Sequence, residues 1–314
     1  MPANTAVLIA AYNAAATLDR AIASALAQPE TAEVCVVDDC SRDATAEIAE
    51  AWRARDARVI VVNQRFNAGP AAARNAAIEA TTAPWLTILD ADDFLLPGRL
   101  TTLQAHGAAD FVADRLIRVP EGAPAPAFTI VNEPAHELSF EAFVLGNTGG
   151  VRGPLDLGFI KPLFSRAFVA QHRLRYREEM RLGEDYEFYA RALALGARFL
   201  VTAPAGYVSV EREGSLSKAH SEADLRHLRD CDDALRTIRP LAPQERRALD
   251  RHWRHVDCRL QWRRLISAVK ARDTRAALSA FHTPASSVYL AARLAEQAWR
   301  RSLRALGATP ASAH

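Results

Sequence analysis

A short apolar run that ends in clustered carboxylates constrains this chain more than any other stretch. Residues 85–89 read Trp-Leu-Thr-Ile-Leu and are followed at once by Asp90, Asp92 and Asp93. Buried strands of α/β sheets are short apolar runs of this kind, and ligands bind beyond their carboxyl ends. Carboxylates crowded there favour a divalent cation shared with substrate phosphates. A solvated turn is the alternative, because aspartate is common in turns.

Three further apolar runs precede this one, and helical segments separate them. The runs cover residues 7–11, 33–37 and 59–62. Residues 17–26 carry apolar side chains four apart, the period of an amphipathic helix, and residues 71–80 are expected to form another helix. Strands that alternate with helices predict a mostly parallel sheet with right-handed crossovers. The fold class is therefore α/β.

Polar residues stand at the ends of three of these predicted strands. Tyr12 follows the first, Asp38 and Asp39 follow the second, and the cluster that begins at Asp90 follows the fourth. Parallel strands place their carboxyl ends along one edge, so these side chains are expected to meet there. Ser41 or Asp43 is expected to cap the next helix.

Several protein classes are disfavoured by what the sequence lacks. It has neither a GxGxxG dinucleotide fingerprint nor a GxxxxGK[ST] phosphate loop. The net charge of +2 implies no nucleic-acid partner. The four cysteines show no metal-binding or disulfide spacing, which fits a reducing, cytoplasmic setting. We recognise neither a signal peptide nor an apolar run near the ~20 residues that span a bilayer.

Four motifs in the first third of the chain resemble those of the inverting family 2 glycosyltransferases, which have the GT-A fold. They are Ala11-Tyr12-Asn13, then residues 37–43 (VDDCSRD), residues 67–75 (NAGPAAARN) and residues 89–93 (LDADD). The match is close over residues 5–100 and looser as far as residue 217. The resemblance implies a Rossmann-like GT-A domain that binds a nucleotide sugar.

The resemblance also implies a role for each motif. Ala11 and Tyr12 would contact the base, with the aromatic ring stacked on it, unless Tyr12 is simply a core residue. Asp39 would accept the uracil imide hydrogen, unless Asp38 and Asp39 only build a turn. Arg74 would lie near the diphosphate, or else on a solvated helix face. Asp92, together with Asp93 or Asp90, would hold Mn²⁺ or Mg²⁺. Asp92 and Asp93 are taken as the metal ligands with Asp90 beside the donor, and which carboxylate touches the metal and which the ribose stays open.

The second half supplies a candidate base and a candidate loop over the diphosphate. Residues 183–185 (Gly-Glu-Asp) resemble the motif that carries the catalytic base, which would be Asp185. A positioned carboxylate can take the proton of an acceptor hydroxyl, although a carboxylate at a helix start can also serve only as a cap. Arg212 and Ser215 are candidates for phosphate contact. Glu213 stands where many relatives have histidine. The glycine-dense residues 146–154 suit a lid or a plain surface loop.

The C-terminal third is expected to be helical and basic. From Arg251 onward there are 12 Lys and Arg residues against Asp257, Asp273 and Glu296. Residues 292–304 interleave Trp and Leu with arginines, which suits a helix lying on an anionic membrane surface or one docked on the catalytic domain. We therefore expect a catalytic domain over residues 1–217, with a donor half to about 100 and an acceptor half from 101, and a basic helical region over 218–314.

The resemblance, taken with the cysteine usage and the basic C-terminal helices, implies a cytoplasmic, metal-dependent, inverting hexosyltransferase, peripheral at the inner membrane face. Its donor would be a UDP-sugar, with glucose favoured, and its acceptor a glycan or polyprenyl-linked intermediate of exopolysaccharide biosynthesis. Two alternatives stay open. A sugar nucleotidyltransferase would want a glycine- and lysine-rich loop where residues 10–13 read Ala-Ala-Tyr-Asn. A non-catalytic nucleotide-sugar or glycan-binding protein would have no need of Asp185.

Overall fold

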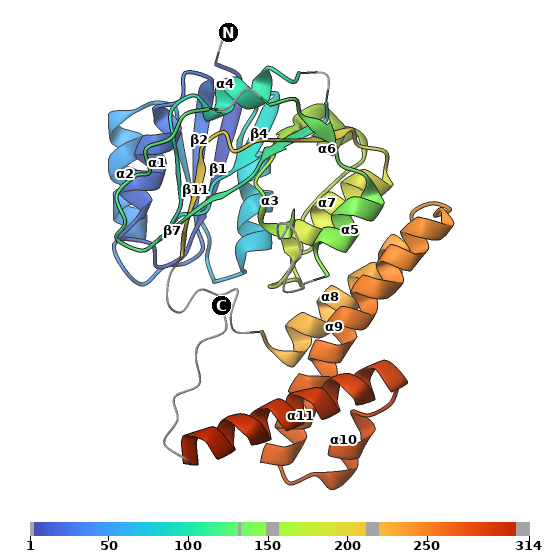
Figure 1. Ribbon diagram of the computed structural model, residues 1–314. Coiled ribbons are helices and arrows are strands. Elements are labelled where there is room, and N and C mark those ends of the chain that lie inside the picture. Colours follow the sequence, from blue (N-terminus) through green and yellow to red (C-terminus); the bar gives the residue numbers. More distant parts are fainter. Residues whose placement is uncertain (1–2, 108, 131–132, 149–156, 212–219, 306–314) are drawn as a thin grey trace.

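An eight-stranded sheet forms the centre of the protein. The computed structural model describes residues 3–107, 109–130, 133–148, 157–211 and 220–305. The strand order in the sheet is β3-β2-β1-β4-β9-β6-β10-β8, and Figure 1 labels β1, β2 and β4 of this sheet. Its strands are β1 Thr5–Ala11, β2 Thr31–Asp38, β3 Val59–Asn63, β4 Trp85–Ile88, β6 Phe111–Asp114, β8 His136–Glu137, β9 Leu163–Ser165 and β10 Phe199–Thr202.

The sheet is mostly parallel, which confirms the predicted fold class. Strands β1 to β4 run parallel to one another, and β6 runs parallel to β10. Strand β9 is antiparallel to both of its neighbours, β4 and β6. The amino end of β9 therefore lies at the same edge as the carboxyl ends of β1, β2 and β4. Residues just before β9 are delivered to the edge where the site was predicted.

Helices cover both faces of the first four strands. Helices α1 (Leu18–Leu26) and α2 (Thr45–Arg55) lie on one face and α3 (Pro70–Ala80) on the other (Figure 1). Alternate residues of β1 divide accordingly: Val7 and Ile9 pack in the core under α1, and Ala6 and Leu8 pack in the core under α3. This two-sided burial is why the strands read as continuous apolar runs.

Of the two residues expected to cap α2, only Asp43 contacts the start of that helix. Ala44, which has no side-chain acceptor, stands at the N-cap position. The Ser41 hydroxyl accepts from the backbone amide of Asn13, and the Asp43 carboxylate accepts from the amides of Ala15 and Thr45. Both polar side chains thus tie the β1–α1 loop to the β2–α2 loop, an interaction between segments that local sequence cannot reveal.

A second, three-stranded sheet has the order β5-β11-β7. Its strands are β5 Phe94–Leu95, β7 Ile117–Pro120 and β11 Tyr207–Glu211. The remaining short helices are α4 Arg99–Gln104, α5 Phe140–Gly146, the 3₁₀ helix η1 Leu157–Phe159 and α6 Arg166–Gln171. Arg99 and Asp114 form a fully buried ion pair at 2.8 Å. The same guanidinium donates to the backbone carbonyl of Lys161, the residue that leads toward β9.

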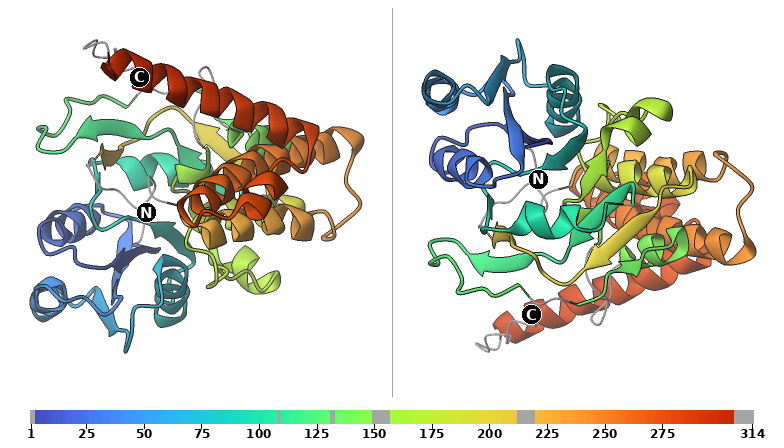
Figure 2. Two further views of the ribbon diagram at one scale, coloured as in Figure 1. Left: turned by 90° about the horizontal axis from the view of Figure 1, so that it is seen from below. Right: turned by 90° about the horizontal axis from the view of Figure 1, so that it is seen from above.

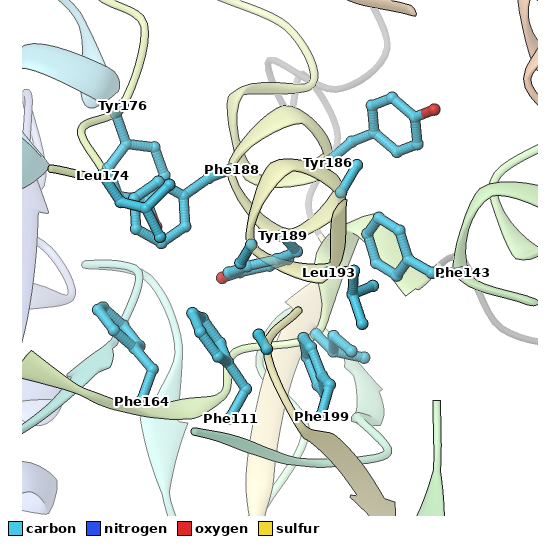
Figure 3. Close-up of a cluster of buried hydrophobic side chains, with 14 of the residues drawn as sticks. Phe111, Phe143, Phe164, Leu174, Tyr176, Tyr186, Phe188, Tyr189, Leu193 and Phe199 are labelled. Atoms are coloured by element: carbon cyan, nitrogen blue, oxygen red, sulfur yellow. The ribbon is translucent and has the colours of Figure 1, made fainter. Parts of the chain in front are cut away.

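Helix α7 (Glu184–Ala194) packs on the sheet through an aromatic cluster (Figure 3). Phe111 stacks on Phe164 and Phe199, and Phe188 of α7 stacks on Tyr176. Almost every residue of α7 is buried. A helix that is buried all round must be covered on its outer side as well.

The C-terminal helices provide that cover. They are α8 Glu222–Leu235, α9 Pro243–Lys270, α10 Thr274–Ser279 and α11 Pro284–Ala305. They form a group of their own beside α5 and α7 (Figure 1, Figure 2), which confirms the expected helical extension. The predicted boundary at residue 217 falls outside the described residues and stays a prediction. Within the described ranges, no helix is both long and apolar enough to cross a membrane.

Candidate active site

The carboxyl ends of β1, β2 and β4 meet at one edge of the sheet, as expected. The amide of Asp39 donates to the Ala11 carbonyl at 2.8 Å, and the amide of Leu89 donates to the Leu8 carbonyl at 3.0 Å. Tyr12, directly after β1, leaves 45% of its surface exposed. The alternative of a core tyrosine is therefore wrong, whereas Ala11 is buried in the strand. Stacking of Tyr12 on a base stays a prediction.

Asp39 fastens a loop to this edge. Its two carboxylate oxygens accept from the amides of Ala68 and Gly69, at 2.7 and 2.8 Å. Gly69 has φ +92°, a backbone conformation that side chains disfavour, and α3 begins right after it. Asp38 accepts from the amide of Ser41 at 3.1 Å. Both aspartates therefore have the turn-building role that was left open, and the uracil contact of Asp39 stays a prediction.

Four side chains form a closed ring of alternating charge at the same edge. Arg74 of α3 contacts Asp90 at 3.0 Å and Asp185 at 2.9 Å through different nitrogens. The Lys161 ammonium contacts the other oxygen of each carboxylate, at 3.0 Å to Asp90 and 2.7 Å to Asp185. We call these four residues the charge ring. It joins α3, the end of β4, the start of β9 and the first turn of α7.

The charge ring is buried except at one corner. The side chains of Arg74, Lys161 and Asp185 are 4–8% exposed, whereas that of Asp90 is 35% exposed. Arg74 also contacts Glu184 at 2.8 Å. A solvated position for Arg74 is therefore wrong, because its guanidinium is buried among three carboxylates. Asp90 is therefore the member of the charge ring that solvent, and hence a bound ligand, can reach.

The charges of the ring outweigh the effects of burial. Burial alone would lower the pKa of Lys161, but the charges of Asp185 and Asp90 raise it above the ordinary value. Burial would likewise raise the pKa of Asp90, yet Lys161 and Arg74 lower it. At Glu184 burial prevails over Arg74, and the pKa is raised. Lys161 and Arg74 therefore stay protonated and Asp90 stays ionised at neutral pH.

The other two carboxylates of the opening cluster differ from each other. Asp93 is buried and accepts from the Val210 amide of β11 at 2.8 Å. Burial first, and then the charges of Asp90 and Asp92, raise the pKa of Asp93 to about 7. Asp92 is half-buried, and its backbone carbonyl accepts from Arg20 at 2.9 Å. Asp93 therefore faces the second sheet, while Asp90 and Asp92 stand closer to solvent.

Carboxylate oxygens are hard donors and suit Mn²⁺ or Mg²⁺. Across the described residues, no group of three or more His, Cys, Asp or Glu side chains is arranged to hold a metal ion. A cation at this edge would therefore rely on one or two carboxylates and on substrate phosphates, the arrangement that is common for Mg²⁺. The residues present fit that arrangement.

The predicted residues divide into those that the structure brings together and those it does not describe. Asp185 lies in the first turn of α7, as expected, next to Asp90 and Arg74. Arg212 and Ser215 lie outside the described residues, and so does most of the glycine-dense segment 146–154. Sequence reasoning missed Lys161. Its one local signal was a lysine within the otherwise apolar stretch 159–164.

Comparisons with known proteins agree on one kind of enzyme. The sequence model described as Glycosyl transferase family 2 matches residues 6–122. Succinoglycan biosynthesis protein ExoU of Rhizobium meliloti (strain 1021) is 43% identical over 270 residues, covering 84% of this chain and 79% of that protein. Succinoglycan biosynthesis protein ExoO of the same strain is 40% identical over 219 residues, covering 67% and 62%.

A solved structure extends the likeness to the fold. S. aureus TarS, crystallised in complex with UDP-GlcNAc, superposes with a TM-score of 0.64 at 18% identity, covering 88% of this chain and 90% of that one. The mostly parallel sheet is thus that of the GT-A fold. The 43% sequence identity with ExoU goes beyond the fold and shows the family. The chain belongs to glycosyltransferase family 2.

Proposed function

We propose that the enzyme transfers a hexose, with glucose favoured, from a UDP-sugar to a glycan or polyprenyl-linked acceptor in exopolysaccharide assembly. The transfer would invert the anomeric carbon and use Mn²⁺ or Mg²⁺, in the cytoplasm. The charge ring is the observation that carries this proposal, because one ammonium contacts both Asp90 of the Asp-x-Asp motif and Asp185. The succinoglycan role in the names of ExoU and ExoO supports the exopolysaccharide setting.

Asp185 is the proposed base. Inversion by a single displacement needs one group to take the proton of the attacking hydroxyl as the bond to the anomeric carbon forms. A carboxylate fixed by Arg74 and Lys161 on two sides can do this without losing its position. Glu184, the residue before Asp185, also contacts Arg74 and helps to hold its guanidinium in place.

The proposed leaving-group side lies at the open corner of the charge ring. Asp92 and Asp90 would hold the cation, since Asp93 is turned to β11. When bound, the cation would stabilise the negative charge that develops on the departing diphosphate. Tyr12 and Asp39 would receive the uridine, an assignment in keeping with the UDP-GlcNAc bound to TarS, although that likeness is one of fold alone.

A donor screen tests the reaction. The full chain with Mn²⁺ is offered UDP-glucose, UDP-galactose and UDP-GlcNAc, with water as the acceptor, and UDP release is measured. We expect release from at least one donor. Asp185→Asn should reduce turnover by about 10²- to 10⁴-fold, the usual contribution of a general base, while UDP affinity persists. Asp250→Asn, on the exposed face of α9, is the matched control. Unchanged turnover in Asp185→Asn would remove Asp185 as the base.

A binding experiment tests the metal assignment separately. UDP is titrated calorimetrically into the full chain with and without Mn²⁺. In the wild-type protein Mn²⁺ should strengthen UDP binding, and in Asp92→Ala this gain should disappear. A gain of equal size in the variant would move the cation away from Asp92.

An exposed apolar stripe supports a peripheral membrane contact as a further part of the proposal. Val288 and Trp299, eleven residues apart on α11, are 72% and 61% exposed. They lie on one side of the helix, whereas Leu290 is buried on the other. Arg300, which follows Trp299 and is exposed, would suit anionic lipid headgroups.

Vesicle flotation tests the membrane contact. The full chain should float with vesicles that contain anionic lipid and not with neutral ones. Val288→Ser combined with Trp299→Ser should abolish flotation and leave UDP binding intact. Equal flotation of this variant would leave α11 as a helix that is merely docked on α9.

A further inference from the structure

The residue after the proposed base points into the C-terminal helices. Tyr186 is 3% exposed and lies on the side of α7 away from Tyr176 and Phe188 (Figure 3). Its hydroxyl donates to Asp232 of α8 at 2.8 Å. Its ring stacks on His252 of α9, with ring centres 4.3 Å apart. The first turn of α7 is therefore held by side chains from two helices that follow the sheet domain.

Asp232 is the centre of this contact. It is fully buried, and its second oxygen lies 2.7 Å from Nδ1 of His252. A buried carboxylate is costly unless it is well paired, and an apolar group of similar shape would usually stabilise packing as well or better. The polar contacts among Tyr186, Asp232 and His252 are directional, which apolar packing is not. A hydrogen bond fixes the rotation of α7 about its axis, whereas an apolar contact tolerates sliding.

Two further contacts join α7 to the C-terminal region, one at each end of α7. A Cβ added to Gly183, the N-cap of α7 with φ +72°, would stand 2.5 Å from Cδ1 of Leu228. Leu228 is one helical turn before Asp232 on the same side of α8. At the other end of α7, Arg239 donates to the carbonyl of Ala194 at 2.9 Å. The helix that carries the proposed base is thus fixed along its length by the C-terminal region.

We propose that Asp232 and His252 are positioning residues, which set the place of Asp185 through Tyr186. The C-terminal helices are then a working part of the active site and not an appendage to it. The inference rests on the proposed role of Asp185. A side-chain atom ~6 Å from a helix axis moves by about 1 Å when the helix turns by about 10°. A misplacement of that size can cost on the order of 10²-fold in rate.

Steady-state kinetics of the full chain test this proposal, with UDP-glucose or another donor that the screen shows to be turned over, and water as acceptor. Tyr186→Phe and Asp232→Leu should each lower kcat by about 10- to 100-fold, with the KM for donor and the affinity for UDP unchanged. The double variant should be no slower than the slower single variant, because both changes remove the same hydrogen bond. Asp233→Leu, at a 59% exposed neighbouring position on α8, is the matched control and should behave as wild type.

Each outcome decides the matter. A kcat within about twofold of wild type in Tyr186→Phe, where Asp185→Asn is inactive, overturns the positioning role and leaves the proposed function standing. A loss of UDP affinity that parallels the loss of kcat also overturns it, because a general loosening of the fold would affect both. Full turnover in Asp185→Asn would instead remove the proposed base, and the inference with it. The expected split between kcat and KM, together with the double-variant result, supports it.

Discussion

Replacing Lys161 with methionine removes one charge from the charge ring and keeps the length of the side chain. Arg74 and Lys161 contact three carboxylates, those of Asp90, Glu184 and Asp185. The formal charge of the charge ring together with Glu184 is therefore 2 − 3 = −1. Without Lys161 it becomes −2, and Asp185 retains only Arg74 as a cationic partner among the contacts described here. Removing one member of a buried ion pair typically costs ~3–5 kcal/mol. Asp90 can recover some hydration at its open corner, which places the expected loss near the lower end, about 3 kcal/mol.

Urea denaturation of the full chain without metal, followed by circular dichroism, measures this loss. Lys270→Met is the matched control, because Lys270 is an exposed lysine at the end of α9, and it should change the free energy of unfolding by under ~0.5 kcal/mol. Added Mn²⁺ should also stabilise Lys161→Met more than it stabilises wild type. A ligand stabilises the state that binds it, and the variant lacks the ammonium that contacts Asp90. A loss below ~1 kcal/mol in Lys161→Met, the range of exposed pairs, would refute the charge ring as a buried electrostatic unit.

Three further predictions concern single side chains. Asp39→Ala should free the Ala68–Gly69 turn and weaken UDP binding by about tenfold or more; equal calorimetric affinity would contradict this. Burial, and then Arg259, lower the pKa of His255 to about 4, so between pH 6.5 and 4 the unfolded chain takes up the proton first and stability falls as pH falls. In His255→Gln the urea midpoint should fall less steeply with pH than in wild type, and an equal slope of midpoint against pH in the two proteins would contradict this. Arg99→Met should leave Asp114 buried without its partner and cost ~3–5 kcal/mol in urea; a cost under ~1 kcal/mol would speak against a structural role for the pair.

The parts of the fold that depend on local pattern were predictable. The first four strands and the three helices between them follow from apolar runs and helical spacing, because each element buries its own continuous face. The acidic edge followed from the parallel arrangement, which puts the ends of β1, β2 and β4 together. Asp185 at the start of α7 followed from the motif at residues 183–185. Each of these expectations needed only neighbouring residues or one topological rule.

What escaped prediction depends on pairing between distant segments. Nothing in residues 163–165 reveals that β9 inserts antiparallel between β4 and β6. That reversal decides the chemistry of the site, because it is what brings Lys161 to the carboxyl edge of β4. The burial of Arg74 escaped for the same reason, since its carboxylate partners come from residues 90, 184 and 185. Ser41 likewise binds another loop and does not cap the helix that follows it, and Asp43 binds that other loop as well as the first residue of the helix.

The antiparallel strand also explains why the charge ring can form at all. A parallel strand at this position would have its amino end, and hence the residue two places before it, at the opposite edge of the sheet. Because β9 runs the other way, its lead-in reaches Asp90 while the strand itself still pairs with β4. Arg99 then holds the Lys161 carbonyl through a hydrogen bond. A change that loosens Arg99 should therefore reach the site through Lys161, and Arg99→Met should weaken UDP binding as well as the fold, whereas Lys270→Met should affect neither.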